Sequence, residues 1–218
     1  MATRAELRKL TELAYDFAND IRDLLNKTVC NGAVVKAAVV KDADESIMIV
    51  GTDLDDVYAA RPVPLHIDRK KPKCWLDAQF RCDLDDRGFL RVLSSYFGIY
   101  APDAETPLCH YDYEREKEGY PAAHVQIDGT CSALGALPGP RTDKDLAKLH
   151  FPVGGRRYRP TLEDMVEFVV MEGFASGRRG WRKAVNDHRD RFHRIQLRAA
   201  VRRMPDVAVE VLREMGEI

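Results

Sequence analysis

The feature that most constrains the fold is a change in the spacing of apolar residues along the chain. Between residues 33 and 152, apolar and polar residues alternate over short segments, a period of two that is typical of strands. Before this stretch, and again after residue 160, apolar residues recur every three or four positions, as in amphipathic helices. This order predicts an α+β protein: an N-terminal long helix, an antiparallel β-sheet, and C-terminal helices packed on one side.

The first expected helix covers residues 3–27. Thr3 and Glu6 have the spacing of a capping box, which satisfies free backbone N–H groups at a helix start. Asn31-Gly32 is a typical stop signal. The apolar stripe consists of Leu7, Leu10, Ala14, Phe17, Ile21 and Leu24.

The middle of the chain predicts a run of strands joined by turns. The Asp85–Gly88 segment is the clearest turn, because glycine adopts a positive φ at little cost. Residues 129–145, rich in Gly, Pro and charge, are expected to form a loop. The expected strands are a hairpin near 33–50 and the segments 63–67, 74–82, 89–100, 109–116, 121–129 and 149–155.

The C-terminal part predicts three helices. Thr161, with Asp164 three residues later, marks the start of a helix over 162–172. A longer helix follows from residue 178, and Pro205 separates it from a short last helix. The apolar seam of the longer helix consists of Trp181, Val185, His188, Phe192, Ile195 and Ala199. We read His188 as a core or interface residue, and the seam either packs within the chain or forms a homodimer contact.

We therefore expect residues 1–175 to form an α+β domain with a curved antiparallel sheet, and residues 176–218 a helical tail packed on it. Gly154-Gly155 fits neither a dinucleotide-binding fingerprint nor a phosphate-binding P-loop, so we expect no nucleotide cofactor. No apolar run approaches the ~20 residues of a membrane span, and the N-terminus lacks the apolar segment of a secretory signal.

The cysteines and the charge indicate the compartment and the kind of partner. None of the five cysteines forms a Cys-x-x-Cys pair, so reduced thiols in a cytoplasmic protein are the simpler interpretation. The net charge of −1 is a sum of unlike parts: residues 141–218 hold 17 Lys and Arg against 12 Asp and Glu, leaving 17 against 23 for residues 1–140. This asymmetry is compatible with a polyanionic or acidic partner at one end.

Histidines gather on the last expected strands. Alternate residues of a strand point to the same face, so His110 and Asp112 share one face while Tyr111 points to the other. If the strands pair in chain order, one sheet surface collects His110, Asp112, His124, Gln126, Asp128 and His150. Such a set either performs acid–base chemistry near neutral pH, binds a divalent transition metal, or forms structural hydrogen bonds. No metal-ligand spacing is convincing, so we expect no metal.

Two groups of arginines are candidate phosphate contacts. Arg156, Arg157 and Arg159 precede the Thr161-capped helix, whose N-terminus attracts anions. The alternative is a solvated turn paired with the acidic residues of that helix. Along the long helix, Arg191, Arg194 and Arg198 follow one face, either as a nucleic-acid footprint or as a solvated, salt-bridged surface.

The stretch FLRVLSSYFGIY, CHYDYERE, PAAHVQIDG and LHFPVGGRRYRPTLEDMVEFVV, within residues 89–173, resembles the small sheet domain of TumE-type toxins of bacterial toxin–antitoxin systems. Tyr111-Asp112, His124 and the helix at 162–172 follow that family's order, and Gln126 stands where a second histidine would complete His-x-His. The resemblance implies a toxin-like protein that acts on RNA and is neutralised by a cognate antitoxin.

Two functional hypotheses follow. In the first, an intracellular bacterial toxin-like protein recognises or cleaves RNA without a metal: His110 and His124 exchange protons, Asp112 orients them, and Tyr111 assists. In that hypothesis, arginines hold the phosphates. In the second, a non-enzymatic binding or scaffold protein uses its basic helical tail to engage an acidic protein partner.

Overall fold

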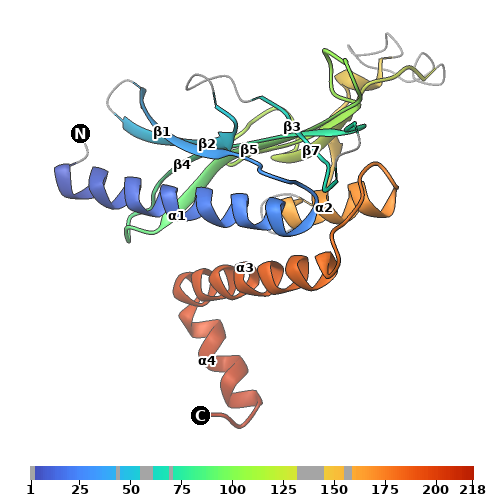
Figure 1. The fold of residues 1–218 in the computed structure, drawn as a ribbon. Coiled ribbons are helices and arrows are strands. Elements are labelled where there is room, and N and C mark those ends of the chain that lie inside the picture. Colours follow the sequence, from blue (N-terminus) through green and yellow to red (C-terminus); the bar gives the residue numbers. More distant parts are fainter. Residues whose placement is uncertain (1–2, 43–44, 55–60, 69–70, 132–144, 155–158) are drawn as a thin grey trace.

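The computed structural model describes residues 3–42, 45–54, 61–68, 71–131, 145–154 and 159–218. The strands form one antiparallel sheet, and the helices lie on one side of it (Figure 1). Helices α1 and α2 lie next to the sheet, α3 lies beneath them, and α4 projects away from the body. The structure thus confirms the α+β class, with helices packed on one side.

The sheet follows chain order closely. Its path runs β1-β2-β4-β5-β6-β7-β8, and β3 pairs with β4 beside the end of β2. Every pairing is antiparallel, as expected for strands joined by turns. The strands are β1 (Val35–Asp42), β2 (Glu45–Thr52), β3 (Val63–Pro64), β4 (Trp75–Leu84), β5 (Leu90–Tyr100), β6 (Cys109–Glu114), β7 (Ala123–Ile127) and β8 (Phe151–Pro152).

Two of the predicted strands are much shorter than expected. Among the described residues, the segment 63–67 forms a strand only at Val63 and Pro64, and 149–154 only at Phe151 and Pro152. One further backbone hydrogen bond follows each strand, from Leu65 N–H to the Cys74 carbonyl and from Val153 N–H to the Ala123 carbonyl. Each strand contains a proline, which has no N–H to donate to a ladder. The Asp85–Gly88 turn is as predicted: the Asp85 carboxylate accepts from the backbone N–H of Arg87 and Phe89, and Gly88 has φ +74°.

Helix α1 (Arg4–Thr28) covers the sheet with its apolar stripe. Thr3 and Glu6 form the predicted capping box, which fixes the helix start. Leu10, Ile21 and Leu24 are almost fully buried against residues of β2, β4 and β5. This layer is the main hydrophobic core; among the described residues, no α-helix lies on the opposite face of the sheet, which the short 3-10 helix η2 (Leu146–Lys148) contacts at β7.

The C-terminal helices are α2 (Leu162–Met171), α3 (Trp181–Arg203) and α4 (Pro205–Glu214). Thr161 and Asp164 cap α2 as predicted. The seam of α3 packs only in its first half: Val185 is buried, whereas Ile195 is 59% exposed. Of the two alternatives for the seam, packing within the chain is thus seen for its first half. Near the end of α3, the carbonyl oxygen of Arg202 accepts from Arg87, and the Arg202 guanidinium lies 4.5 Å from the centroid of the Phe89 ring.

Four of the five cysteines are buried, and none is in a disulfide. Burial raises the pKa of the Cys74 thiol to about 11 and those of Cys30 and Cys82 to about 12, which keeps these thiols protonated and unreactive. Within the described part of the chain, no helix has the length and apolar character needed to cross a membrane.

Candidate functional site

The face of the sheet opposite the described α-helices collects polar side chains from three neighbouring strands. In the register, Tyr96 on β5 lies opposite Asp112 on β6, and Asp112 lies opposite His124 on β7. In the adjacent row, His110 lies between Gly98 and Gln126. Strand alternation thus places His110, Asp112, His124 and Gln126 together, as the sequence predicts. We call the group His110, Asp112, His124, Gln126, Tyr96, Tyr120 and His150 the histidine face.

Asp112 lies between two imidazole rings. One carboxylate oxygen, Oδ2, is 3.3 Å from His110 Nε2 and 3.5 Å from His124 Nε2. The contact with Asp112 raises the pKa of His110 above its ordinary value, because a nearby carboxylate favours the charged ring. A single carboxylate therefore orients both rings.

Gln126 fixes which nitrogen of His110 carries the proton. The Gln126 amide donates to the carbonyl of Ala147 in η2 (Leu146–Lys148), so its oxygen faces His110 Nε2 at 2.9 Å and accepts. Both oxygens near Nε2 are acceptors, so Nε2 carries hydrogen. In the neutral ring, Nδ1 then holds the free lone pair and can accept a proton.

His124 is enclosed, unlike His110. Its side chain is only 2% exposed, against 23% for that of His110. Its Nδ1 lies 3.0 Å from the carbonyl oxygen of Pro121. Tyr120 and His150 stack on each other with ring centroids 4.1 Å apart, and both rings contact that of His124. His124 is therefore placed to hold Asp112, whereas the half-exposed His150 is the more accessible second imidazole.

Two members of the site come from strands that the sequence analysis did not connect to the histidines. Tyr96 stacks against His110 with centroids 5.5 Å apart, and its hydroxyl lies 3.0 Å from that of Tyr100. Asp77 on β4 lies opposite Gly98. Burial raises the pKa of Asp77 to about 6, despite a hydrogen bond from Thr52. The alternation of β4 and β5 shows which residues share a face with Asp77 and with Tyr96. Only the register between the strands shows that this face also carries the histidines.

The close packing of the tyrosine pair depends on a glycine. A Cβ atom added at Gly98 would lie 2.6 Å from the Tyr96 hydroxyl and 2.8 Å from the Tyr100 ring. Both distances are shorter than ordinary van der Waals contact. The absence of a side chain at Gly98 therefore allows the Tyr96 ring to lie beside His110.

A groove runs along this face next to Asp112. It has a volume of about 540 Å³ and is lined by residues of β4, β5, β6 and the turn after β6. Its cationic side chains are Arg81, Arg115 and Lys117, and Glu114 and Glu116 also line it. Most of the side chains that line the groove are polar or charged, which suits a charged ligand better than a small apolar one.

Several predicted site residues lie elsewhere. Tyr111 points to the helix-covered face, where it packs against the core. Arg159 places its guanidinium 4.2 Å from the centroid of the buried Tyr113 ring, and burial lowers the pKa of Arg159. Arg156 and Arg157 lie outside the described residues. Asp128 follows the end of β7, where it accepts from Thr106. Of these, Tyr111 and Arg159 are separated from the histidines by the sheet itself.

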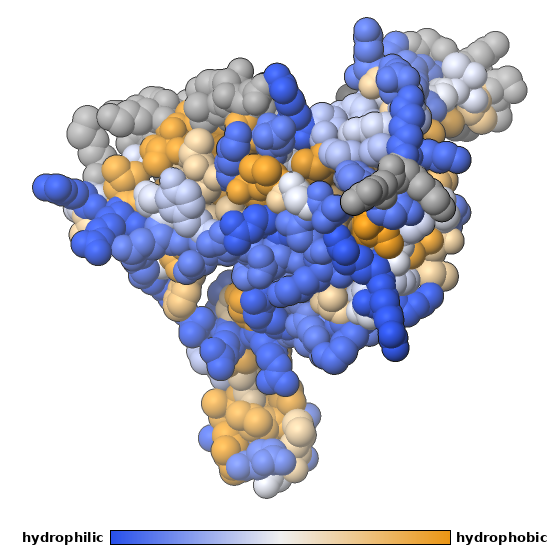
Figure 2. Space-filling view, in the orientation of Figure 1, coloured by the Kyte–Doolittle hydropathy of each residue, from blue (hydrophilic) through white to orange (hydrophobic). Residues whose placement is uncertain are grey.

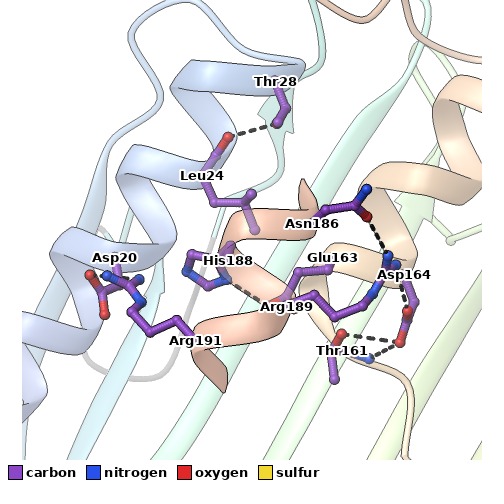
Figure 3. Close-up of polar contacts among 10 residues, drawn as sticks. All are labelled: Asp20, Leu24, Thr28, Thr161, Glu163, Asp164, Asn186, His188, Arg189 and Arg191. Atoms are coloured by element: carbon purple, nitrogen blue, oxygen red, sulfur yellow. Dashed lines mark hydrogen bonds and ion pairs between the residues drawn. The ribbon is translucent and has the colours of Figure 1, made fainter. Parts of the chain in front are cut away.

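The arginines of α3 lie on the helical side of the molecule. Arg191 pairs with Asp20 of α1 at 2.9 Å, and Arg189 pairs with Asp164 of α2 (Figure 3). Arg189 also pairs with Glu167 of α2. Arg194 and Arg198 are exposed. The stripe is thus partly a salt-bridged interface between helices, and it does not form one surface with the histidine face.

Comparisons with known proteins give no relative for the chain. No family model, no curated protein and no solved structure matches it. Among the described residues, no group of three or more His, Cys, Asp or Glu side chains is arranged to hold a metal ion.

Proposed function

We propose that the histidine face cleaves RNA by acid–base chemistry that requires no metal ion. The observation that carries the proposal is Asp112 shared between His110 and His124, on the sheet face opposite the described α-helices. An imidazole oriented by a carboxylate is an effective proton acceptor near neutral pH. In the adjoining groove, Arg81, Arg115 and Lys117 are the side chains that would contact a phosphate backbone, and Lys117 also pairs with Glu114 at 3.2 Å.

In this reaction His110 acts as the base. With hydrogen on Nε2, its Nδ1 takes the proton of a ribose 2′-hydroxyl, and the 2′-oxygen attacks the neighbouring phosphorus. The bond from phosphorus to the 5′-oxygen breaks, and that oxygen takes a proton from His150. The products are a 2′,3′-cyclic phosphate and a 5′-hydroxyl. His124 keeps Asp112 in place and does not contact the substrate.

The resemblance of residues 89–173 to TumE-type toxins favours RNA over other polyanions. It also favours a bacterial, cytoplasmic protein that a cognate antitoxin neutralises. The toxin-like order of Tyr111-Asp112, His124 and the following helix coincides in sequence with β6, β7 and α2.

The test is cleavage of a labelled single-stranded RNA in the presence of EDTA. We expect cleavage of RNA, with a cyclic phosphate product, and no cleavage of DNA or 2′-O-methyl RNA of the same sequence. His110→Gln should abolish cleavage, whereas His193→Gln, an exposed histidine of α3, should leave it unchanged. An intact protein that cleaves no RNA, or His110→Gln that cleaves at the wild-type rate, would overturn the proposal.

The second candidate is a binding protein without catalytic activity. The observation that favours it is the exposed apolar surface of the C-terminal helices, which no part of the body covers. If the intact protein binds a protein partner and cleaves no RNA in the assay above, this candidate is supported.

A further inference from the structure

Helix α4 is amphipathic, and its apolar side is uncovered. Val207, Val211 and Met215 recur every four residues, so they lie along one side of the helix; we call them the α4 stripe. Their exposed fractions are 40%, 45% and 65%, and no residue of α4 is buried. Figure 2 shows hydrophobic surface gathered on the part of the molecule that projects from the body.

The last turns of α3 carry a second uncovered apolar row. Leu197, Val201 and Met204, spaced four and three apart, are 65%, 42% and 58% exposed; we call them the α3 stripe. Helical geometry places Arg194 and Arg198 beside this row. A water-soluble chain seldom exposes two such rows together unless another molecule covers them.

The chain cannot bring its own α4 against its own α3 stripe. Met204 is both the last cap of α3 and the first cap of α4, so the two helices are joined through one residue. Antiparallel neighbouring helices need a loop of about 2–5 residues. Pro205 at the start of α4 also prevents the backbone from continuing α3. The apolar sides of α3 and α4 therefore stay apart within one copy.

The charges of the two surfaces are complementary. Glu210 and Glu214 lie along one edge of the α4 stripe, and the first turn of α4 adds Asp206. The last turns of α3 contain Arg194, Arg198, Arg202 and Arg203, and no acidic residue lies between 191 and 203. An acidic apolar helix and a basic apolar helix of one chain thus match each other but cannot meet within it.

We propose that a second copy of this chain covers these surfaces, with α4 of each copy packed across the last turns of α3 of the other. Such an exchange is closed by a two-fold axis, so both copies bury both stripes. Glu210 and Glu214 of one copy then face Arg194 and Arg198 of the other. The proposal does not depend on the proposed RNA cleavage, because α3 and α4 lie on the helical side of the sheet and the histidine face lies on the opposite side.

The experiment measures the mass of the full chain in solution by analytical ultracentrifugation over a range of concentrations. We expect a reversible dimer of twice 24.7 kDa. Val211→Asp in the α4 stripe should weaken the dimer by about tenfold or more, as expected for a charge placed in an apolar contact. Val209→Asp is the matched control: Val209 is also exposed on α4 but lies opposite the stripe, so the dimer should persist.

A charge exchange tests the pairing directly. Reversing Glu210 and Glu214 to Arg, or Arg194 and Arg198 to Glu, should each weaken the dimer. Combining all four substitutions in one chain should restore it, because each new Arg would face a new Glu on the other copy. A chain that is monomeric at every concentration, a dimer unaffected by Val211→Asp, or a combined variant that fails to recover would overturn the proposal.

Discussion

His124 lies 3.5 Å from Asp112 through Nε2 while its Nδ1 faces the carbonyl oxygen of Pro121 at 3.0 Å. The ring therefore bridges a strand carboxylate and the backbone just before its own strand. This relationship separates the two histidines that share Asp112, since one is enclosed and the other reaches the surface. Their substitution should have different effects.

Replacing His124 should affect stability, and replacing His110 should not. We expect His124→Ala to lower the free energy of unfolding by about 1–3 kcal/mol, because it empties a buried site and leaves Asp112 with one partner fewer. His110→Ala should change it by less than about 1 kcal/mol while abolishing RNA cleavage. Urea unfolding of both variants checks this, and equal losses of stability would contradict the separation of roles.

Asp112→Asn should shift the pH dependence of cleavage. Asp112 raises the pKa of His110, and the base must be neutral, so the acid limb of kcat/KM should lie above the ordinary histidine pKa of about 6.5. Without the carboxylate, the limb should move to lower pH. An NMR titration of His110 provides a reading independent of activity. An acid limb at the same pH in both proteins would show that Asp112 does not act on this ring.

Asp77→Asn should stabilise the protein at neutral pH. Burial raises the pKa of Asp77 to about 6 from 3.8, so the folded state holds a proton that the unfolded state releases between these values. Stability is therefore lost as the pH rises through this window. Because the side chain is partly exposed, we expect Asn to gain only about 1–2 kcal/mol at pH 8 and nothing at pH 3. Unfolding measured at the two pH values tests the difference.

Glu163 and His188 should hold the helical tail on the body. The Glu163 carboxylate is buried, and His188 Nδ1 lies 2.5 Å away, across the contact between α2 and α3 (Figure 3). Burial alone would raise the pKa of Glu163, but the hydrogen bond from His188 and further hydrogen bonds bring it below its ordinary value. We expect the ionised Glu163 carboxylate to contribute fully to the free energy of unfolding above pH 4.5. This contribution should disappear as the pH falls through the lowered pKa of Glu163.

We expect Glu163→Gln to cost about 3 kcal/mol of unfolding free energy at neutral pH, since it removes one partner of a buried pair. Arg191→Ala is the control, because its pair with Asp20 is about half exposed and should contribute less than about 1 kcal/mol. Denaturant unfolding at neutral and acidic pH compares the two. A loss of similar size for Arg191→Ala would show that Glu163 has no special place in the interface.

The sequence by itself determined the secondary structure and the class of fold. The period of two in β4 to β7, the period near 3.6 in α1 and α2, and the caps at Thr3 and Thr161 are local signals, set by neighbouring residues. Alternation also determined that His110 and Asp112 share a face and that Tyr111 does not, because the side-chain period of a strand is fixed.

Only the tertiary structure decided which residues meet. The register that sets Asp112 opposite both Tyr96 and His124 depends on how strands β5, β6 and β7 pair, and in the neighbouring β4–β5 pair a bulge shifts the register between Arg81 and Cys82. The burial of His124 beneath His150 depends on β8 reaching the edge of β7. Likewise, the apolar pattern of α3 continues past Val185, but Ile195 is 59% exposed. Packing between segments far apart in the chain decides such contacts. A local sequence pattern does not predict which distant segment packs against it.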